Sequence, residues 1–313
     1  MKYTNIGFIG AGKRVRENYL PVLEALGDRV KVAGTYTRSG TQLDDIPVFD
    51  SIESLGEECD VLICVVPPES IPSVGMQAIN TGKRVLLETP LVQTTMDMEA
   101  FNGLTGAQRE RVGVAENWPF LPMECFKREV INSGIIGDVI VVENDYRTFM
   151  YHGIAQLRSY LKNADSIMRI QTLSKQFALD NGKIDPWFYR IVEFEDDSLL
   201  VFKYSDQYKR VNFRLPMSLR IYGTKGTIES DCTYDPNCKI IYEDESGESQ
   251  RLEVSIVDDE ITAGDITWKS PISGLDEHQI SLYQHVDSLV EGKPLYPVHE
   301  ALMDMVILHS ASR

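Results

Sequence analysis

The sequence predicts an α/β protein that begins with a parallel sheet covered by helices on both faces and continues into an α+β region with a mainly antiparallel sheet. Three observations support this. Short apolar runs alternate with helical periodicity as far as about residue 120. A glycine-rich turn follows the first of these runs. Longer runs of alternating apolar and polar residues dominate the rest of the chain.

The first third of the chain alternates between the two periodicities. Helical spacing of apolar residues covers Arg16–Leu26 and Ile71–Gly82. Apolar runs typical of buried strands are Asn5–Gly10, Val30–Thr37, Asp60–Val66, Arg84–Thr89 and Arg111–Glu116. Because strands and helices alternate, a doubly wound parallel sheet is expected.

The pattern changes after about residue 120, where we place the boundary between a domain of residues 1–120 and a domain of residues 121–313. A helix is predicted over Pro122–Gly134, and others over His152–Leu161, Asp276–Gly292 and Pro297–Ser310. Between these helices, long alternating runs indicate antiparallel strands, with a hairpin turning at Gly247. The acidic stretch Asp258–Thr267 is expected to be a solvated loop or an insertion.

Composition excludes several classes of function. The formal net charge is −16, so the surface repels nucleic acid and anionic membranes, and neither is an expected partner. The five cysteines are scattered without a C-x-x-C pair, which predicts reduced thiols in a cytoplasmic protein and no metal site. The first residues enter a strand directly rather than a signal peptide, and no apolar run is long enough to span a bilayer.

A phosphate-binding turn is predicted after the first strand. Gly10 and Gly12 stand at the first two glycine positions of the dinucleotide fingerprint, while Val15 occupies the third. Gly10 permits the tight turn, and Gly12 lets a pyrophosphate approach the helix N-terminus. Lys13 and Arg14 add positive charge beside it. The alternative is an ordinary strand-turn-helix without a ligand.

The end of the second predicted strand indicates which dinucleotide binds. NAD sites usually carry an acidic residue there, to bind the ribose 2′-hydroxyl. This chain has Thr37, Arg38 and Ser39 instead. A guanidinium flanked by hydroxyls suits a 2′-phosphate, so NADP is the expected cofactor, with NAD as the alternative. An exposed loop arginine without a ligand is the other interpretation of Arg38.

Seven segments in the same order resemble the Gfo/Idh/MocA family, which includes glucose-fructose oxidoreductase and inositol dehydrogenase. They are GFIGAG, DVLICVVPPES, TGKRVLLETPL, VGVAENWPFLP, INSGIIGDVIVVE, HGIAQLRSYL and IYGTKGTIE. The resemblance covers nearly the whole chain. It implies an N-terminal Rossmann domain, a C-terminal domain with a large open sheet, and a homo-oligomer, dimer or tetramer, assembled through that sheet.

The same resemblance assigns candidate roles and shows departures. The family motif Glu-Lys-Pro is Glu-Thr-Pro here, with Thr89 in the place of the catalytic lysine. The helix motif Asp-x-x-x-His aligns with Thr148 and His152, so the aspartate is lost and the histidine kept. We therefore expect His152 to be the general acid or base. The alternative is a structural histidine at a helix start.

The other candidate residues follow from the aligned segments. Tyr151 is a candidate proton donor, and Trp118, Tyr146 and Thr148 are expected to contact the substrate together with His152. Trp118 could instead belong to an interdomain core. The remaining residues expected to bind the cofactor are Val66, Pro67, Glu88, Thr89 and Asn117.

Three functions remain open. The first is an NAD(P)-dependent oxidoreductase that transfers hydride to or from a carbonyl or secondary alcohol of a sugar-like or other small polar metabolite. The second is a lyase or epimerase that oxidises its substrate transiently. The third is a non-catalytic nucleotide-binding or partner-binding protein, favoured by the threonines at two catalytic positions. Retention of His152 and of the glycine turn argues against this third function.

Overall fold

The computed structural model describes residues 3–146, 149–180, 182–205, 217–230 and 237–310. The chain forms two compact units. Unit 1 consists of Met1–Asn117 and Pro271–Met305, and unit 2 of Trp118–Ser270 and Val306–Arg313. The first boundary lies within three residues of the predicted one, but the second domain is not the continuous range 121–313 that we predicted, because residues 271–305 return to unit 1.

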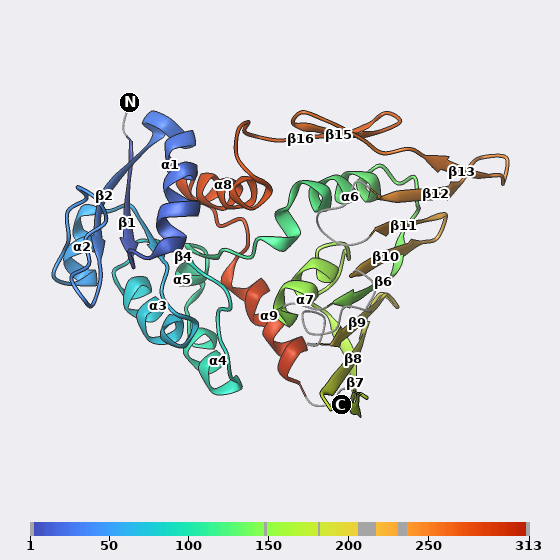
Figure 1. Cartoon of the computed structure of the whole chain (residues 1–313), viewed down its shortest axis with the longest axis horizontal. Coiled ribbons are helices and arrows are strands. Elements are labelled where there is room, and N and C mark those ends of the chain that lie inside the picture. Colours follow the sequence, from blue (N-terminus) through green and yellow to red (C-terminus); the bar gives the residue numbers. More distant parts are fainter. Residues whose placement is uncertain (1–2, 147–148, 181, 206–216, 231–236, 311–313) are drawn as a thin grey trace. The chain divides into compact units, whose positions relative to one another are not determined.

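Unit 1 is built on the predicted parallel sheet, with strand order β2-β1-β3-β4-β5. Its strands are β1 (Thr4–Ile9), β2 (Val30–Tyr36), β3 (Val61–Cys64), β4 (Arg84–Leu87) and β5 (Val112–Val114). Helices cover both faces (Figure 1). They are α1 (Leu20–Leu26), α2 (Ile52–Glu58), α3 (Ile71–Asn80), α4 (Thr95–Asn102), α5 (Gly106–Arg109) and α8 (Glu277–Val290). Strand β1 lies between β2 and β3. The strand order therefore reverses at β1: β2 lies on one side of it, and β3, β4 and β5 follow on the other side.

Helix α8 explains why the late segment belongs to unit 1. Its apolar residues Leu282, Val286 and Leu289 share one buried core with residues of β1 and β4. The end of the helix is capped by Arg84 of β4, whose Nη1 donates to the carbonyls of Leu289 (2.6 Å) and Val290 (2.7 Å). Sequence periodicity revealed the apolar stripe of this helix but could not show which sheet it covers.

Unit 2 contains an eight-stranded sheet of order β13-β12-β11-β10-β6-β9-β8-β7, in which only the β6–β9 pair is parallel. Its strands are β6 (Val139–Tyr146), β7 (Ile167–Ala178), β8 (Ile184–Phe194), β9 (Leu199–Ser205), β10 (Ser218–Gly223), β11 (Gly226–Ser230), β12 (Lys239–Glu243) and β13 (Ser249–Leu252). The predicted hairpin is confirmed: β12 and β13 pair, and Gly247 turns with φ +82°.

One face of this sheet packs against helices. Helix α6 (Pro122–Asn132) and helix α7 (Met150–Arg158) lie on it (Figure 1), and their apolar residues share a core with those of the strands. The last residues of α9 (Val298–His309) also belong to this core, through Ile307. No helix in the described part of the chain is long and apolar enough to cross a membrane.

The acidic stretch Asp258–Thr267 is not a loop, contrary to our prediction. A small antiparallel sheet is formed by β14 (Ser255–Val257), β15 (Glu260–Ala263) and β16 (Ile266–Lys269). Ile261 and Ala263 alternate inward from β15 and are buried beside α6. The strands are short and the turns between them are acidic, so the alternation of apolar and polar residues could not be recognised in the sequence.

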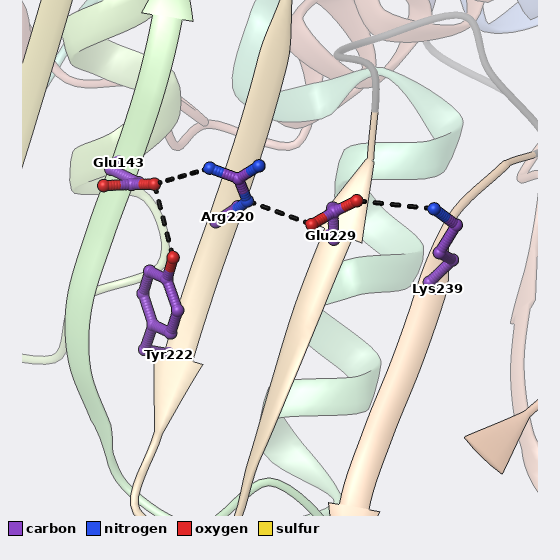
Figure 2. A network of polar contacts seen from close by, with 5 residues as sticks. All are labelled: Glu143, Arg220, Tyr222, Glu229 and Lys239. Atoms are coloured by element: carbon purple, nitrogen blue, oxygen red, sulfur yellow. Dashed lines mark hydrogen bonds and ion pairs between the residues drawn. The ribbon is translucent and has the colours of Figure 1, made fainter.

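The other face of the large sheet carries a row of paired charges (Figure 2). Arg220 of β10 donates to Glu143 of β6 and to Glu229 of β11, both at 3.0 Å. Lys239 of β12 lies 3.4 Å from Glu229, and the Tyr222 hydroxyl donates to Glu143 at 3.3 Å. These hydrogen bonds raise the pKa of Arg220 and lower that of Glu229. Cross-strand pairing therefore neutralises the charges on this face.

Buried His285 of α8 should make unit 1 sensitive to acid. Its Nε2 contacts the Glu116 carbonyl oxygen at 2.9 Å, and burial lowers its pKa to about 4. In the unfolded chain a histidine titrates near 6.5. The unfolded state therefore binds the proton more readily, and stability falls as the pH decreases from about 6.5 to about 4. Between pH 7 and pH 4.5, we expect wild type to lose about 2–3 kcal/mol more than His285→Gln in urea unfolding. Equal losses in both proteins would contradict this assignment.

Candidate functional site

The turn after β1 has the backbone geometry of a phosphate-binding loop. Gly10 adopts φ +109°, and a Cβ built on it would lie only 2.1 Å from the Val65 carbonyl oxygen. Gly12 differs, since a Cβ there would meet nothing within 4 Å. Thus Gly10 is required by the fold, whereas Gly12 leaves open space beside the start of the following helical segment. The N–H groups of a first helical turn favour an anion in such a space.

A cavity of about 690 Å³ lies at the carboxyl ends of β1, β2 and β3. Seven of the predicted cofactor residues line it: Gly10, Gly12, Thr37, Arg38, Ser39, Val66 and Pro67. This edge of the sheet is where the strand order reverses, the usual ligand position in open α/β sheets. The volume also falls in the range of small-molecule sites. Geometry and dimensions therefore fit a dinucleotide.

The loop after β2 presents hydroxyls and one guanidinium to this cavity. The Thr37 hydroxyl donates to the Thr41 carbonyl oxygen at 3.1 Å, and the Ser39 and Thr41 hydroxyl oxygens lie 2.7 Å apart. Arg38 is exposed in the same loop. The nearby acidic residue Asp44 is 2.7 Å from the Arg16 guanidinium and does not line the cavity. The lining thus lacks the carboxylate that a ribose 2′-hydroxyl would require.

We predicted that Arg14 adds positive charge beside the phosphate-binding turn, but its guanidinium contacts the carboxylate of Glu88. Its Nε donates to Glu88 Oε1 at 2.9 Å, and the buried Tyr19 hydroxyl donates to the same oxygen at 2.8 Å. Burial lowers the pKa of Arg14, but the charge of Glu88 raises it, and the net shift is upward. Burial also raises the pKa of Tyr19 well above its usual value. Arg14 therefore neutralises and orients Glu88 and does not line the cavity.

Four other predicted cofactor residues are also absent from the cavity lining: Lys13, Glu88, Thr89 and Asn117. Lys13 is exposed, 3.5 Å from Glu17. Thr89 follows β4, and its backbone N–H lies 3.4 Å from Glu88 Oε2. Asn117 is buried, and both its carbonyl and its side-chain oxygen accept from the Ser281 hydroxyl, at 2.9 and 3.2 Å.

Sequence reasoning missed several residues that line the same cavity. They are mostly polar or small: Tyr36, Thr41, Ser70, Ser73 and Gln77. Ser73 and Gln77 are one turn apart on α3, with the same face toward the cavity. The position of this segment could have indicated these residues, because ligands of open α/β sheets lie at the carboxyl ends of the strands. The apolar periodicity of the helix does not identify its polar face as part of a site.

Unit 2 contains the predicted catalytic histidine. His152 lies in the first turn of α7, and its backbone N–H donates to the Phe149 carbonyl at 3.1 Å. Its imidazole stacks on the Trp118 ring, with centroids 5.4 Å apart, and the Tyr151 ring lies at 4.3 Å. The imidazole is thus packed between aromatic rings. Because 9% of the residue's surface is still exposed, it lies at the edge of the core. Such packing fixes the orientation of the imidazole ring.

Buried polar contacts hold α7 in place. Asn144 of β6 donates from Nδ2 to the Gly153 carbonyl at 3.2 Å, directly after His152. At the other end, the Tyr160 hydroxyl donates to Glu124 of α6, whose second oxygen accepts from Lys127 Nζ at 2.9 Å. Glu124 and Lys127 are fully buried. Removing either partner of such a pair costs about 3–5 kcal/mol, so α7 is positioned by contacts that are costly to break.

Two predicted substrate residues cannot be placed completely. Tyr146 ends β6, but its side chain lies outside the described part of the chain. Thr148 also lies outside the described residues. Trp118 is 8% exposed and contributes to the core of unit 2 as well as to the contact with His152. Trp118 is thus a core residue of unit 2, while the alternative of an interdomain core stays a prediction.

Comparison with known proteins defines the class. Residues 4–115 match the model of the Gfo/Idh/MocA oxidoreductase family, described as having an NAD-binding Rossmann fold. This matched region contains the glycine turn and the cavity described above, and it confirms the resemblance seen in the sequence. The N-terminal part of the chain therefore matches the NAD-binding Rossmann domain of the Gfo/Idh/MocA oxidoreductases.

Several curated proteins are similar in sequence. The Saccharomyces cerevisiae protein named "Uncharacterized protein YMR315W" is 24% identical over 276 residues, which cover 77% of this chain and 78% of the yeast protein. "Uncharacterized oxidoreductase YhhX" of Escherichia coli is 25% identical over 150 residues, covering 45% of this chain and 44% of YhhX.

Solved structures share the fold over almost the whole chain. The oxidoreductase TM0312 of Thermotoga maritima superposes with a TM-score of 0.66 at 21% identity, covering 97% of this chain and 94% of that one. UDP-N-acetylglucosamine 3-dehydrogenase GnnA of Acidithiobacillus ferrooxidans gives 0.67 at 14% identity, covering 98% and 96%. The similarity therefore includes the second unit, which the family model does not cover.

Proposed function

We propose that this chain is an NADP(H)-dependent oxidoreductase that reduces or oxidises a carbonyl or secondary alcohol of a small, sugar-like polar metabolite. The observation that carries the proposal is the cavity at the ends of β1–β3, with Arg38 and three hydroxyl groups where an NAD site has a carboxylate. The similar fold of a sugar-nucleotide dehydrogenase supports a sugar-like substrate.

The residues present fit a dinucleotide in distinct ways. Gly12 leaves room for the pyrophosphate beside the helix start, and Arg38 would bind the 2′-phosphate with its planar fork of donors. The nicotinamide group, when bound, supplies or accepts the hydride. This chain must then manage the proton on the substrate oxygen. We assign that proton to His152, because Thr89 carries no ionisable group at the position of the family lysine.

Arg38→Ala tests the cofactor assignment. Titration with NADPH and NADH, followed by nicotinamide fluorescence, should show tighter binding of NADPH to wild type. The variant should lose at least tenfold in NADPH affinity, because a charge-assisted contact to phosphate contributes about 1.5–3 kcal/mol. NADH affinity should change little. Arg109→Ala, which removes an arginine outside the cavity lining, is the matched control. Equal affinity of wild type for both cofactors would reject the preference for NADP.

His152→Ala tests the catalytic assignment. In a screen of sugar-like carbonyl compounds with NADPH, we expect kcat to fall by about 10²–10⁴-fold, the usual contribution of a general acid or base. NADPH binding should be unchanged, because the nucleotide cavity lies in unit 1. His299→Ala is the control, since that histidine is exposed on α9. If wild type binds NADPH but no compound turns over, a non-catalytic nucleotide-binding protein becomes the better conclusion.

We also propose that the chain forms a homo-oligomer through the helix-free face of its large sheet. Leu173, Phe177 and Ile191 of β7 and β8 expose 53%, 53% and 39% of their surface there. The charges farther along the same face, on β6, β10 and β11, are already paired, which lowers the cost of covering them (Figure 2). Light scattering should give a dimer or tetramer for wild type and a smaller species for Leu173→Glu. Ile256→Glu, on exposed β14, is the control, and a monomeric wild type would reject the proposal.

A reducing compartment, the cytoplasm, fits the cysteines. Cys59, Cys64, Cys125 and Cys238 are buried and form no disulfide. Burial raises the pKa of Cys59 and Cys64 to about 12, so that both remain protonated thiols. Thiols of this kind are inert and require no disulfide for stability.

A further inference from the structure

Unit 2 contains a buried arginine for which the described part of the chain provides no counter-ion. Arg190 lies on β8 with 3% of its surface exposed, and its side chain points to the helix-covered face, as do those of Val192 and Phe194. Its guanidinium carbon lies 4.8 Å from the centre of the Phe188 ring. Within the described residues, Nε and Nη1 are fully buried and have no hydrogen-bond partner.

This arrangement is costly for the fold. A buried ion without a partner loses its hydration and gains no compensating contact, which destabilises a protein by several kcal/mol. Burial lowers the pKa of Arg190 to about 10, but the side chain stays charged at neutral pH. The aromatic face of Phe188 stabilises the charge only partly. Unsatisfied buried groups of this kind are often explained by a ligand.

The strand register places Arg190 near α7. Arg190 pairs with Phe202 of β9, and Phe202 pairs with Asn144 of β6, so all three side chains share one face. Two strand spacings, roughly 10 Å, separate the backbones of Arg190 and Asn144. Asn144 in turn donates to the carbonyl of Gly153, the residue after His152. Arg190 and Asn144 therefore lie on the sheet face that carries α7, on either side of Phe202.

Other polar atoms of the same unit also lack partners in the described part of the chain. They are Asn144 Oδ1 and both side-chain atoms of Gln156, which lies on α7 one turn after His152. His309, at the end of α9, lies close enough to Arg190 to interact with its charge. Burial and that positive charge both lower the pKa of His309. Helix α7 and the sheet face beneath it thus carry further hydrogen-bonding groups that a hydroxylated ligand could satisfy.

We propose that Arg190 binds an oxyanion of the substrate, a carboxylate or a phosphate, so that the substrate is a sugar acid or a sugar phosphate rather than a neutral sugar. This inference rests on the proposed function, since it names the substrate class of the same enzyme. In a chain with a net charge of −16, an anion needs a local cation, and Arg190 is such a cation inside unit 2.

The test measures ligand-induced shifts in Tm with three probes: glucuronate, glucose 6-phosphate and glucose. Wild type should be stabilised by glucuronate or by glucose 6-phosphate, which identifies the oxyanion, and not by glucose. Arg190→Met should abolish the shift, and Arg190→Lys should weaken it while keeping the preference for the anion. Without ligand, Arg190→Met should raise Tm by roughly 2–4 °C, because it removes an unpaired buried charge.

Arg251→Met is the matched control, since that arginine is exposed and paired with Glu253 at 3.1 Å. A structural role for Arg190 would give the opposite pattern: a lower Tm for Arg190→Met without ligand and an unchanged shift with the anionic probes. Either that pattern or an equal response of wild type to glucose would overturn the proposal. NADPH titration of the same proteins separates the two hypotheses, because failure to bind NADPH rejects the proposed function without affecting an observed anion site.

Discussion

The close approach of Gly10 to the Val65 carbonyl is the constraint on which the nucleotide half of the molecule depends. It joins the carboxyl end of β1 to the segment after β3, at the position where strand order reverses. A side chain at residue 10 would force these two strand ends apart, because its Cβ would lie 2.1 Å from a backbone oxygen. The cavity, the helix start beside Gly12 and the loop after β2 all take their positions from this contact.

The arginines of this acidic chain differ in whether a carboxylate neutralises them. Arg14, Arg16 and Arg220 contact carboxylates, and they orient a side chain, hold a loop or connect strands. Arg38 and Arg190 have no such contact among the described residues, although one is exposed at a cavity and the other is buried. Loss of hydration makes an unpaired cation expensive to keep when it is buried, so Arg190 requires the stronger explanation.

The sequence was sufficient for the fold wherever a pattern is local. Alternation of strands and helices predicted the parallel sheet, and Gly10 and Gly12 predicted its ligand-binding edge. It was insufficient where the answer depends on distant partners. The contact between Arg14 and Glu88 joins residues 74 positions apart, and helix α8 packs on strands more than 160 residues earlier in the chain. Neither partner can be inferred from spacing, because periodicity describes one face of an element and not what covers it.

The departure at Thr89 changes where the substrate can be stabilised. An ammonium at that position would interact with charge on the reacting oxygen, whereas a threonine hydroxyl can only form a neutral hydrogen bond. Electrostatic stabilisation must then come from other residues of the chain. Unit 2 supplies an imidazole fixed between Trp118 and Tyr151 and, on the sheet under the same helix, a guanidinium at Arg190. In the function that we propose, His152 and Arg190 together take the place of the missing lysine, and this role would offset the cost of keeping Arg190 buried.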